Sequence, residues 1–223
     1  MATKPLQRHR KKSKDGRAAA RKAGRRAAPA PYHHGDLHAA LLQAAETILE
    51  RDGLAGLTLR AAAREAGVSH AAPTHHFGDM TGLLSDLAAS GFRKFAAALA
   101  AATAAEPSAV DRMNAMGEAY VDFAREHPSM FLLMFRSERL DHRRPALHQA
   151  VEEASALLSR GVTERRAGAP STPLSLTAEI ARAWSMVHGF ALLMIDHRLE
   201  PLLSHLPEGT TERDLLRAML RGK

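Results

Sequence analysis

The chain of 223 residues lacks cysteine altogether, which excludes disulfide bonds and thiolate metal sites. It also lacks an apolar run long enough to cross a bilayer. The Walker A, Gly-x-Gly-x-x-Gly, Gly-x-Ser-x-Gly and His-Glu-x-x-His patterns do not occur. The basic N-terminal segment has no apolar stretch behind it, unlike a secretory signal peptide. We therefore expect a cytoplasmic protein without cofactor or metal, and the sequence gives no support for an enzyme.

Acidic residues are nearly absent from the first part of the chain. Residues 1–31 contain eleven Lys or Arg and a single acid, Asp15, whereas the remainder carries a net charge of −3. A segment with this charge and few large apolar side chains cannot bury enough surface to fold alone. It predicts a disordered basic arm that attracts DNA phosphates by counterion release. A tail that only aids solubility is the alternative interpretation.

The rest of the sequence repeats apolar residues at helical spacing, with no strand pattern and no internal repeat. We therefore predict an all-α fold. The expected helices cover, approximately, residues 37–53, 58–67, 69–77, 79–105, 108–127, 128–135, 145–167, 173–199 and 211–220.

The stretch from Thr58 to Phe77 predicts two short helices joined by a tight turn. Thr58 can cap the first helix and Ser69 the second, because each hydroxyl can accept an orphan N–H. Gly67 suits the left-handed position that ends the first helix. The pattern fits a helix-turn-helix, whose second helix enters the DNA major groove, but also an ordinary helical hairpin. The second helix is polar and poor in large apolar residues, which favours the helix-turn-helix.

Four short motifs in this region resemble the N-terminal domain of TetR-type repressors. They are Tyr-His-His-Gly-Asp-Leu at 32–37, Leu-Thr-Leu-Arg at 57–60, Ala-Gly-Val-Ser at 66–69 and His-His-Phe at 75–77. The sequence departs from the family at Thr74 and Met80, where Tyr and Lys usually touch phosphates. After the basic arm at 1–31, the resemblance implies a three-helix DNA-binding domain at 32–78 and a helical bundle for effector binding and dimerisation at 79–223.

The resemblance also implies which residues contact double-stranded DNA. Thr58, Arg60 and Ser69 are expected to hold phosphates. His70, Ala71, Thr74 and His75 are expected to face the groove, where Ala71 can meet a thymine methyl group. His76 belongs to the same polar surface, and His33 either reaches a phosphate or is exposed without a role.

Methionine and aromatic residues are frequent in the C-terminal half, where they form either the core or the wall of an apolar pocket. The segment Trp184-Ser-Met-Val-His188-Gly189 resembles the Trp…His-Gly signature of one C-terminal subgroup of the family. The family favours a pocket for a small apolar or amphipathic effector. The residues expected to line it are Phe123, Phe131, Met134, Trp184 and His188. His188 is equally well explained as a satisfied core histidine.

The last two helices are expected to form a homodimer, because a palindromic operator requires a twofold protein. The interface residues are Leu192, Ile195, Leu199, Leu215 and Met219; alternatively the last helix only caps its own core. The sequence thus predicts an effector-responsive, dimeric repressor. Two other functions stay open: a helical small-molecule carrier or enzyme that reuses the N-terminal module, and a nucleoid-associated protein that binds DNA without choosing a sequence.

Overall fold

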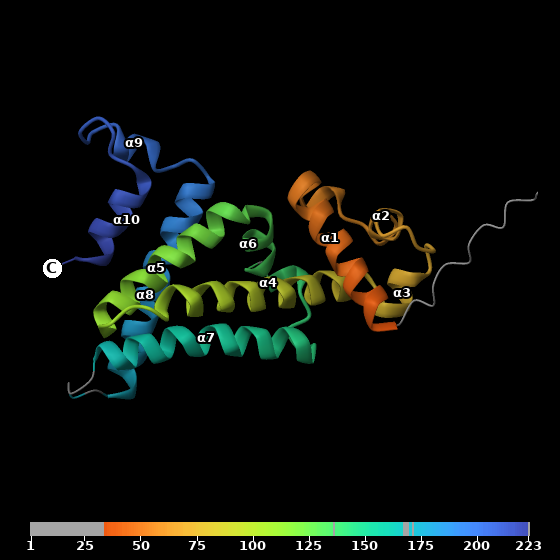
Figure 1. Ribbon diagram of the computed structural model, residues 1–223, viewed down its shortest axis with the longest axis horizontal. Helices are drawn as coiled ribbons and strands as arrows, with labels where there is room; N and C mark the ends of the chain where they lie inside the picture. Colours follow the sequence, from red (N-terminus) through yellow and green to blue (C-terminus); the bar gives the residue numbers. More distant parts are fainter. Residues whose placement is uncertain (1–33, 136, 167–169, 171, 223) are drawn as a thin grey trace, which may run out of the picture. The chain divides into compact units, whose positions relative to one another are not determined.

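The computed structural model describes residues 34–135, 137–166, 170 and 172–222. These residues form ten α-helices and one 3-10 turn, with no strand among them, which confirms the all-α prediction (Figure 1). None of the helices in the described part is long and apolar enough to span a membrane. The predicted basic arm at 1–31 and His33 lie outside the described residues.

Three helices form the N-terminal group: α1 (His34–Gly56), α2 (Leu59–Glu65) and α3 (Ala72–Phe77). The regular part of α1 ends at Gly53, as predicted, because Gly53 has a φ of 68° that a helix cannot continue. A short extra turn then leads to Thr58, whose hydroxyl accepts the Ala61 N–H at 3.0 Å. The predicted N-cap of α2 is therefore confirmed.

The prediction that Ser69 caps the next helix is wrong. Helix α3 begins at Ala72, and its N-cap is Ala71, which provides no side-chain hydrogen bond. The Ser69 carbonyl instead accepts the Ala72 N–H at 3.1 Å in a turn that precedes the helix. Pro73 lies in the first turn, where its missing N–H costs least, so the helix begins without a hydroxyl cap.

Helix α4 (Met80–Thr103) is the longest helix and contacts both the N-terminal group and the helices that follow. The Asp79 carboxylate caps it by accepting the Gly82 N–H at 2.8 Å, as the sequence predicts. Leu83, Leu87 and Phe95 on its inner face are buried. Figure 1 shows α4 extending from α3 alongside α7.

The C-terminal part consists of helices that pack on α4 and on one another. They are α5 (Ala109–Glu126), α6 (Pro128–Met134), α7 (Pro145–Arg165), α8 (Pro173–Ile195), α9 (Glu200–Leu203) and α10 (Glu212–Leu220), with the 3-10 turn η1 (Ser137–Arg139) before α7. The capping box of Thr211 and Asp214 at α10 is confirmed. The short elements η1 and α9 were not predicted, because four residues or fewer give no measurable periodicity.

One continuous apolar core joins the two groups of helices. Leu41 and Leu49 of α1, Leu87 of α4 and Phe131 of α6 are all fully buried within it. Because α4 contributes to the core along its length, a shift of this helix would change the packing of both groups.

Candidate functional site

The surface of α3 is divided sharply between core and solvent. Pro73 and Phe77 are buried, whereas Thr74 and His75, which lie between them in the sequence, are exposed. Gly67, with a φ of 67°, ends α2 as predicted and turns the chain toward α3. The connection between the helices spans residues 66–71 and is longer than the three or four residues expected. The result is a short polar helix that lies on the outside of the folded body.

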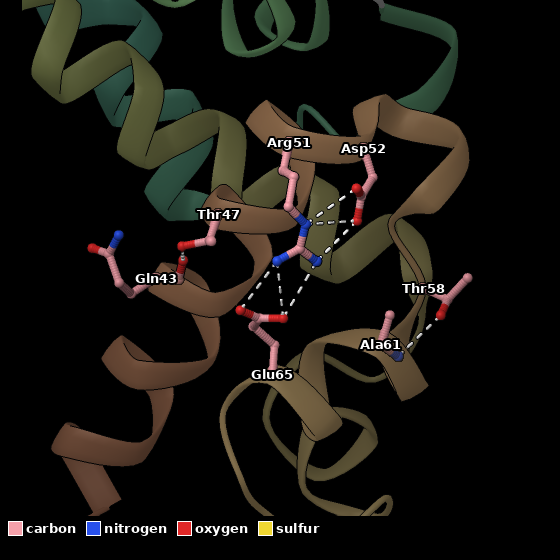
Figure 2. Close-up of polar contacts among 7 residues, drawn as sticks. All are labelled: Gln43, Thr47, Arg51, Asp52, Thr58, Ala61 and Glu65. Atoms are coloured by element: carbon pink, nitrogen blue, oxygen red, sulfur yellow. Dashed lines mark hydrogen bonds and ion pairs between the residues drawn. The ribbon is translucent and has the colours of Figure 1, made fainter.

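The orientation of α2 against α1 is held by one guanidinium group. Arg51 and Asp52 belong to α1, and Glu65 belongs to α2. Nη2 of Arg51 lies 2.9 Å from Oδ2 of Asp52 and 3.4 Å from Oε2 of Glu65 (Figure 2). The hydrogen bonds that Arg51 donates to Asp52 and Glu65 raise the pKa of Arg51, and its bond to Asp52 lowers the pKa of that carboxyl. The pairs are exposed, so they orient the helix more than they stabilise it.

Most of the residues predicted to contact DNA are exposed in the structure. Side chains of Thr58, Arg60, Ser69, His70, Ala71, Thr74 and His75 are exposed. His76 is only half-exposed, because its ring lies 6.0 Å from His38 of α1 and 5.4 Å from His75. His33 is outside the described residues.

Arg64, which was not among the predicted DNA contacts, is exposed in the last turn of α2. It follows Arg60 by four residues, so both guanidinium groups extend from the same side of the helix. Neither arginine makes a hydrogen bond or an ion pair with any described residue. The spacing in the sequence could have identified Arg64.

Asp86 connects α4 to two other elements. Its carboxylate accepts hydrogen bonds from Nε and Nη2 of Arg144 at 2.9 and 3.0 Å, and lies 3.3 Å from Nε2 of His38. The Asp86 side chain is 11% exposed, so these partners replace most of its hydration. Next to it, the Ser85 hydroxyl accepts the Asp141 N–H at 2.9 Å. This network fixes α4 against α1 and against the segment that precedes α7.

An apolar cavity of about 740 Å³ lies among α4, α5, α7 and α8. Its walls include Phe92, Phe95, Met116, Leu158 and Trp184. This volume falls in the usual range for sites that bind small molecules. Because a core that served stability alone would be filled, this cavity is the candidate ligand site of the described residues.

A chain of polar groups crosses one wall of this cavity. Trp184 Nε1 donates to the Tyr120 hydroxyl at 3.3 Å, and that hydroxyl lies 2.9 Å from Nδ1 of His188. The indole can only donate, so the phenol accepts from it and has its own proton left for the imidazole. Burial raises the pKa of Tyr120 and lowers that of His188, so both groups are uncharged at neutral pH.

The residues expected to line an effector pocket are distributed over two environments. Met134 and Trp184 line the cavity, and Trp184 is 46% exposed. Phe123 and Phe131 are buried in the core behind the wall, where Phe123 packs against Phe95 and Phe131 packs against Tyr120. His188 lies in the polar chain just described. The additional wall from α4 had not been expected, because its aromatic residues are indistinguishable from core residues in sequence.

Acidification provides a test of the buried His188. A lowered pKa in the folded state means that the imidazole favours folding above about pH 6.5 and that this contribution is lost as the pH falls toward the folded pKa. We expect the stability difference between wild type and His188→Gln to shrink on acidification across this window and to be constant above it. Urea unfolding at a series of pH values measures it, and parallel stability curves would contradict the assignment.

The predicted interface residues also differ in exposure. Met219 is 41% exposed, and Leu192, Ile195 and Leu215 are half-buried. Leu199 is 2% exposed and packs within its own subunit. Exposed apolar side chains nearby are Leu193, Leu202 and Leu206.

Comparison with known proteins connects both sites to one family. Residues 41–87 match the model for bacterial regulatory proteins of the tetR family. Residues 113–219 match the tetracyclin repressor-like C-terminal domain. The chain belongs to the TetR family. It is therefore a DNA-binding transcriptional regulator, and TetR-family regulators are not enzymes.

Solved structures show a similar fold. A protein of unknown function from Rhodococcus sp. RHA1 is 37% identical, with a TM-score of 0.68 over 85% of this chain and 94% of that one. A protein described as a TetR-family transcription regulator from Shewanella sp. PV-4 is 20% identical, with a TM-score of 0.61 over 82% and 95% of the two chains. The latter likeness concerns the fold alone. A search of curated proteins found no match.

Most of α1 and all of α2 and α3 fall within the matched N-terminal region, and most of the cavity wall falls within the matched C-terminal domain. The two sites therefore lie in different matched regions and are connected by α4.

Proposed function

We propose that this TetR-family regulator is an effector-responsive repressor that binds a palindromic operator as a homodimer in the cytoplasm. The observation that carries the proposal is the division of α3, which presents Thr74 and His75 to solvent while Pro73 and Phe77 hold it to the core. Such a helix can lie in a major groove without any change in packing. We place the DNA-binding domain at 32–78 and the regulatory domain at 79–223.

The roles of individual residues follow from their places on this surface. Thr58 at the start of α2, Arg60 and Arg64 along it, and Ser69 in the turn before α3 would hold phosphates and fix the register. Exposed residues of α3 and the turn before it, His70, Ala71, Thr74 and His75, would read base edges. The basic segment at 1–31 would add affinity that does not depend on sequence.

Dimerisation is supported by apolar side chains that the single subunit leaves exposed. Leu193, Leu202, Leu206 and Met219 are 41 to 55% exposed and all belong to the segment from α8 to α10. On α8, a Cβ added to Gly189 would meet no atom of the subunit within 4 Å, so a second helix can approach closely there. We therefore propose that α8, α9 and α10 face the twofold axis.

Effector binding would reach the DNA through α4. The cavity is walled by Phe92, Phe95 and Leu99 of α4, while the first turns of the same helix contact α1 and α3. A ligand that favours one position of α4 would change the spacing of the two α3 helices in the dimer. The free energy by which the ligand shifts this equilibrium cannot exceed the difference between its binding free energies for the two states.

Salt dependence tests the assignment of α2 to phosphates. We expect Arg60→Ala to weaken binding to all DNA sequences and to reduce the slope of log affinity against log salt by about 0.9 per subunit. Thr74→Ala should instead change the preferred operator and leave the slope as it is. Mobility-shift titrations at several salt concentrations measure both effects.

Arg160→Ala serves as the matched control, because Arg160 is also exposed and lies on α7, outside the N-terminal group. It should leave the salt slope unchanged. An Arg60→Ala slope equal to that of the wild type would remove this residue from the phosphate contacts.

A further inference from the structure

The charge of the cavity wall is of one sign. Its lining includes Arg165 and Arg182, which are both exposed to solvent, but no Asp or Glu. An apolar cavity whose only fixed charges are positive attracts anions and repels cations.

Arg165 and Arg182 are also without partners, since neither forms an ion pair or hydrogen bond with any described residue. The carboxylates nearest to them in sequence are engaged elsewhere. Glu164 lies 3.1 Å from Arg112, and Glu179 pairs with Arg166. Two residues of the lining thus carry guanidinium groups that have no counterion among the described residues.

The remainder of the wall fits an apolar body. Phe92, Phe95 and Leu99 come from α4, Leu158 from α7 and Val187 from α8. Neutral polar residues of α7, Ser155 and Ser159, also belong to the lining and place no charge there. The cavity therefore provides a large apolar surface together with a cationic region.

We infer that the effector is an amphipathic anion, with a single anionic head that pairs with Arg165 and Arg182 and an apolar body against the α4 wall. The planar guanidinium group suits a carboxylate, because two parallel N–H donors match its two oxygens. This inference rests on the proposed effector-responsive function and specifies the chemistry of that site.

Three probes of equal chain length separate charge from hydrophobicity: decanoate, decanamide and decylammonium. Isothermal titration with the full-length protein should show that decanoate binds at least about tenfold more tightly than either of the other two. The double variant Arg165→Gln/Arg182→Gln should lose this preference while its affinity for decanamide stays unchanged. Arg160→Gln, an exposed α7 arginine outside the cavity wall, is the matched control and should bind as the wild type does.

Equal or tighter binding of decylammonium, an unchanged decanoate affinity in the double variant, or no binding of any probe would overturn the inference. Its failure is distinguishable from that of the proposed function by a mobility shift with added probe. If decanoate binds with the expected preference but does not alter DNA affinity, the anion site stands and the effector response fails. If only the uncharged probe binds and releases DNA, the response stands and the anion site fails.

Discussion

Replacing Gly82 with alanine is expected to lower the free energy of unfolding by about 3 kcal/mol and to impair DNA binding further. Gly82 lies in the first turn of α4, and a Cβ at this position would fall 1.9 Å from the carbonyl oxygen of Phe77, the last residue of α3. Because the clash is with backbone, no side-chain rotation relieves it. The α3–α4 turn must move, which displaces the helix that we assign to the major groove.

Thr81→Ala is the matched control for this experiment. Thr81 precedes Gly82, is exposed, and can become alanine without meeting a neighbour. Urea unfolding and mobility shifts should show near wild-type behaviour for Thr81→Ala and a loss of both stability and DNA affinity for Gly82→Ala. Stability of Gly82→Ala within about 0.5 kcal/mol of wild type would contradict the packing described for this turn.

Replacing Arg144 with alanine is expected to cost about 2 kcal/mol of stability. The change leaves the Asp86 carboxylate, 11% exposed, with His38 as its remaining side-chain partner among the described residues. The usual cost of breaking a buried pair is reduced here, because the Arg144 side chain is 30% exposed. Since Asp86 holds α4 to α1 and to the start of α7, this variant should also weaken the coupling between cavity and DNA.

The neighbouring Arg143 provides the control. Its side chain is 96% exposed and lies 3.5 Å from Asp141, so Arg143→Ala should be neutral. A double-mutant cycle of Arg144→Ala with Asp86→Asn should give a coupling energy above about 1 kcal/mol. Additive effects in the cycle would show that the pair does not hold the helices together.

Local features of the fold could be predicted from sequence because their partners are three residues away. Thr58, Asp79 and Thr211 each cap a helix as expected, since a hydroxyl or carboxylate followed by a helical apolar pattern determines the first turn. The same reasoning gave a wrong result for Ser69. Its carbonyl accepts a backbone hydrogen bond in a separate turn, and α3 starts only at Ala72.

Long-range features could not be predicted in the same way. Asp86 is separated from His38 by 48 residues and from Arg144 by 58, and no local pattern indicates that they meet. The cavity presents a similar difficulty, because Phe92 and Phe131 have the same sequence character while only Phe92 reaches the wall. Resemblance to a family identified the class of site, but packing decides which side chains line it.

The central claim is that the exposed face of α3 chooses a DNA sequence. Its most direct test selects DNA from a random pool with the full-length protein, then titrates the selected duplex and a scrambled duplex at physiological salt. We predict a palindromic selected site and an affinity ratio of about a thousandfold or more, which a Thr74→Ala/His75→Ala variant with unchanged unfolding free energy should largely lose. A ratio near one for the wild type, or a variant that keeps the full ratio, would contradict the account.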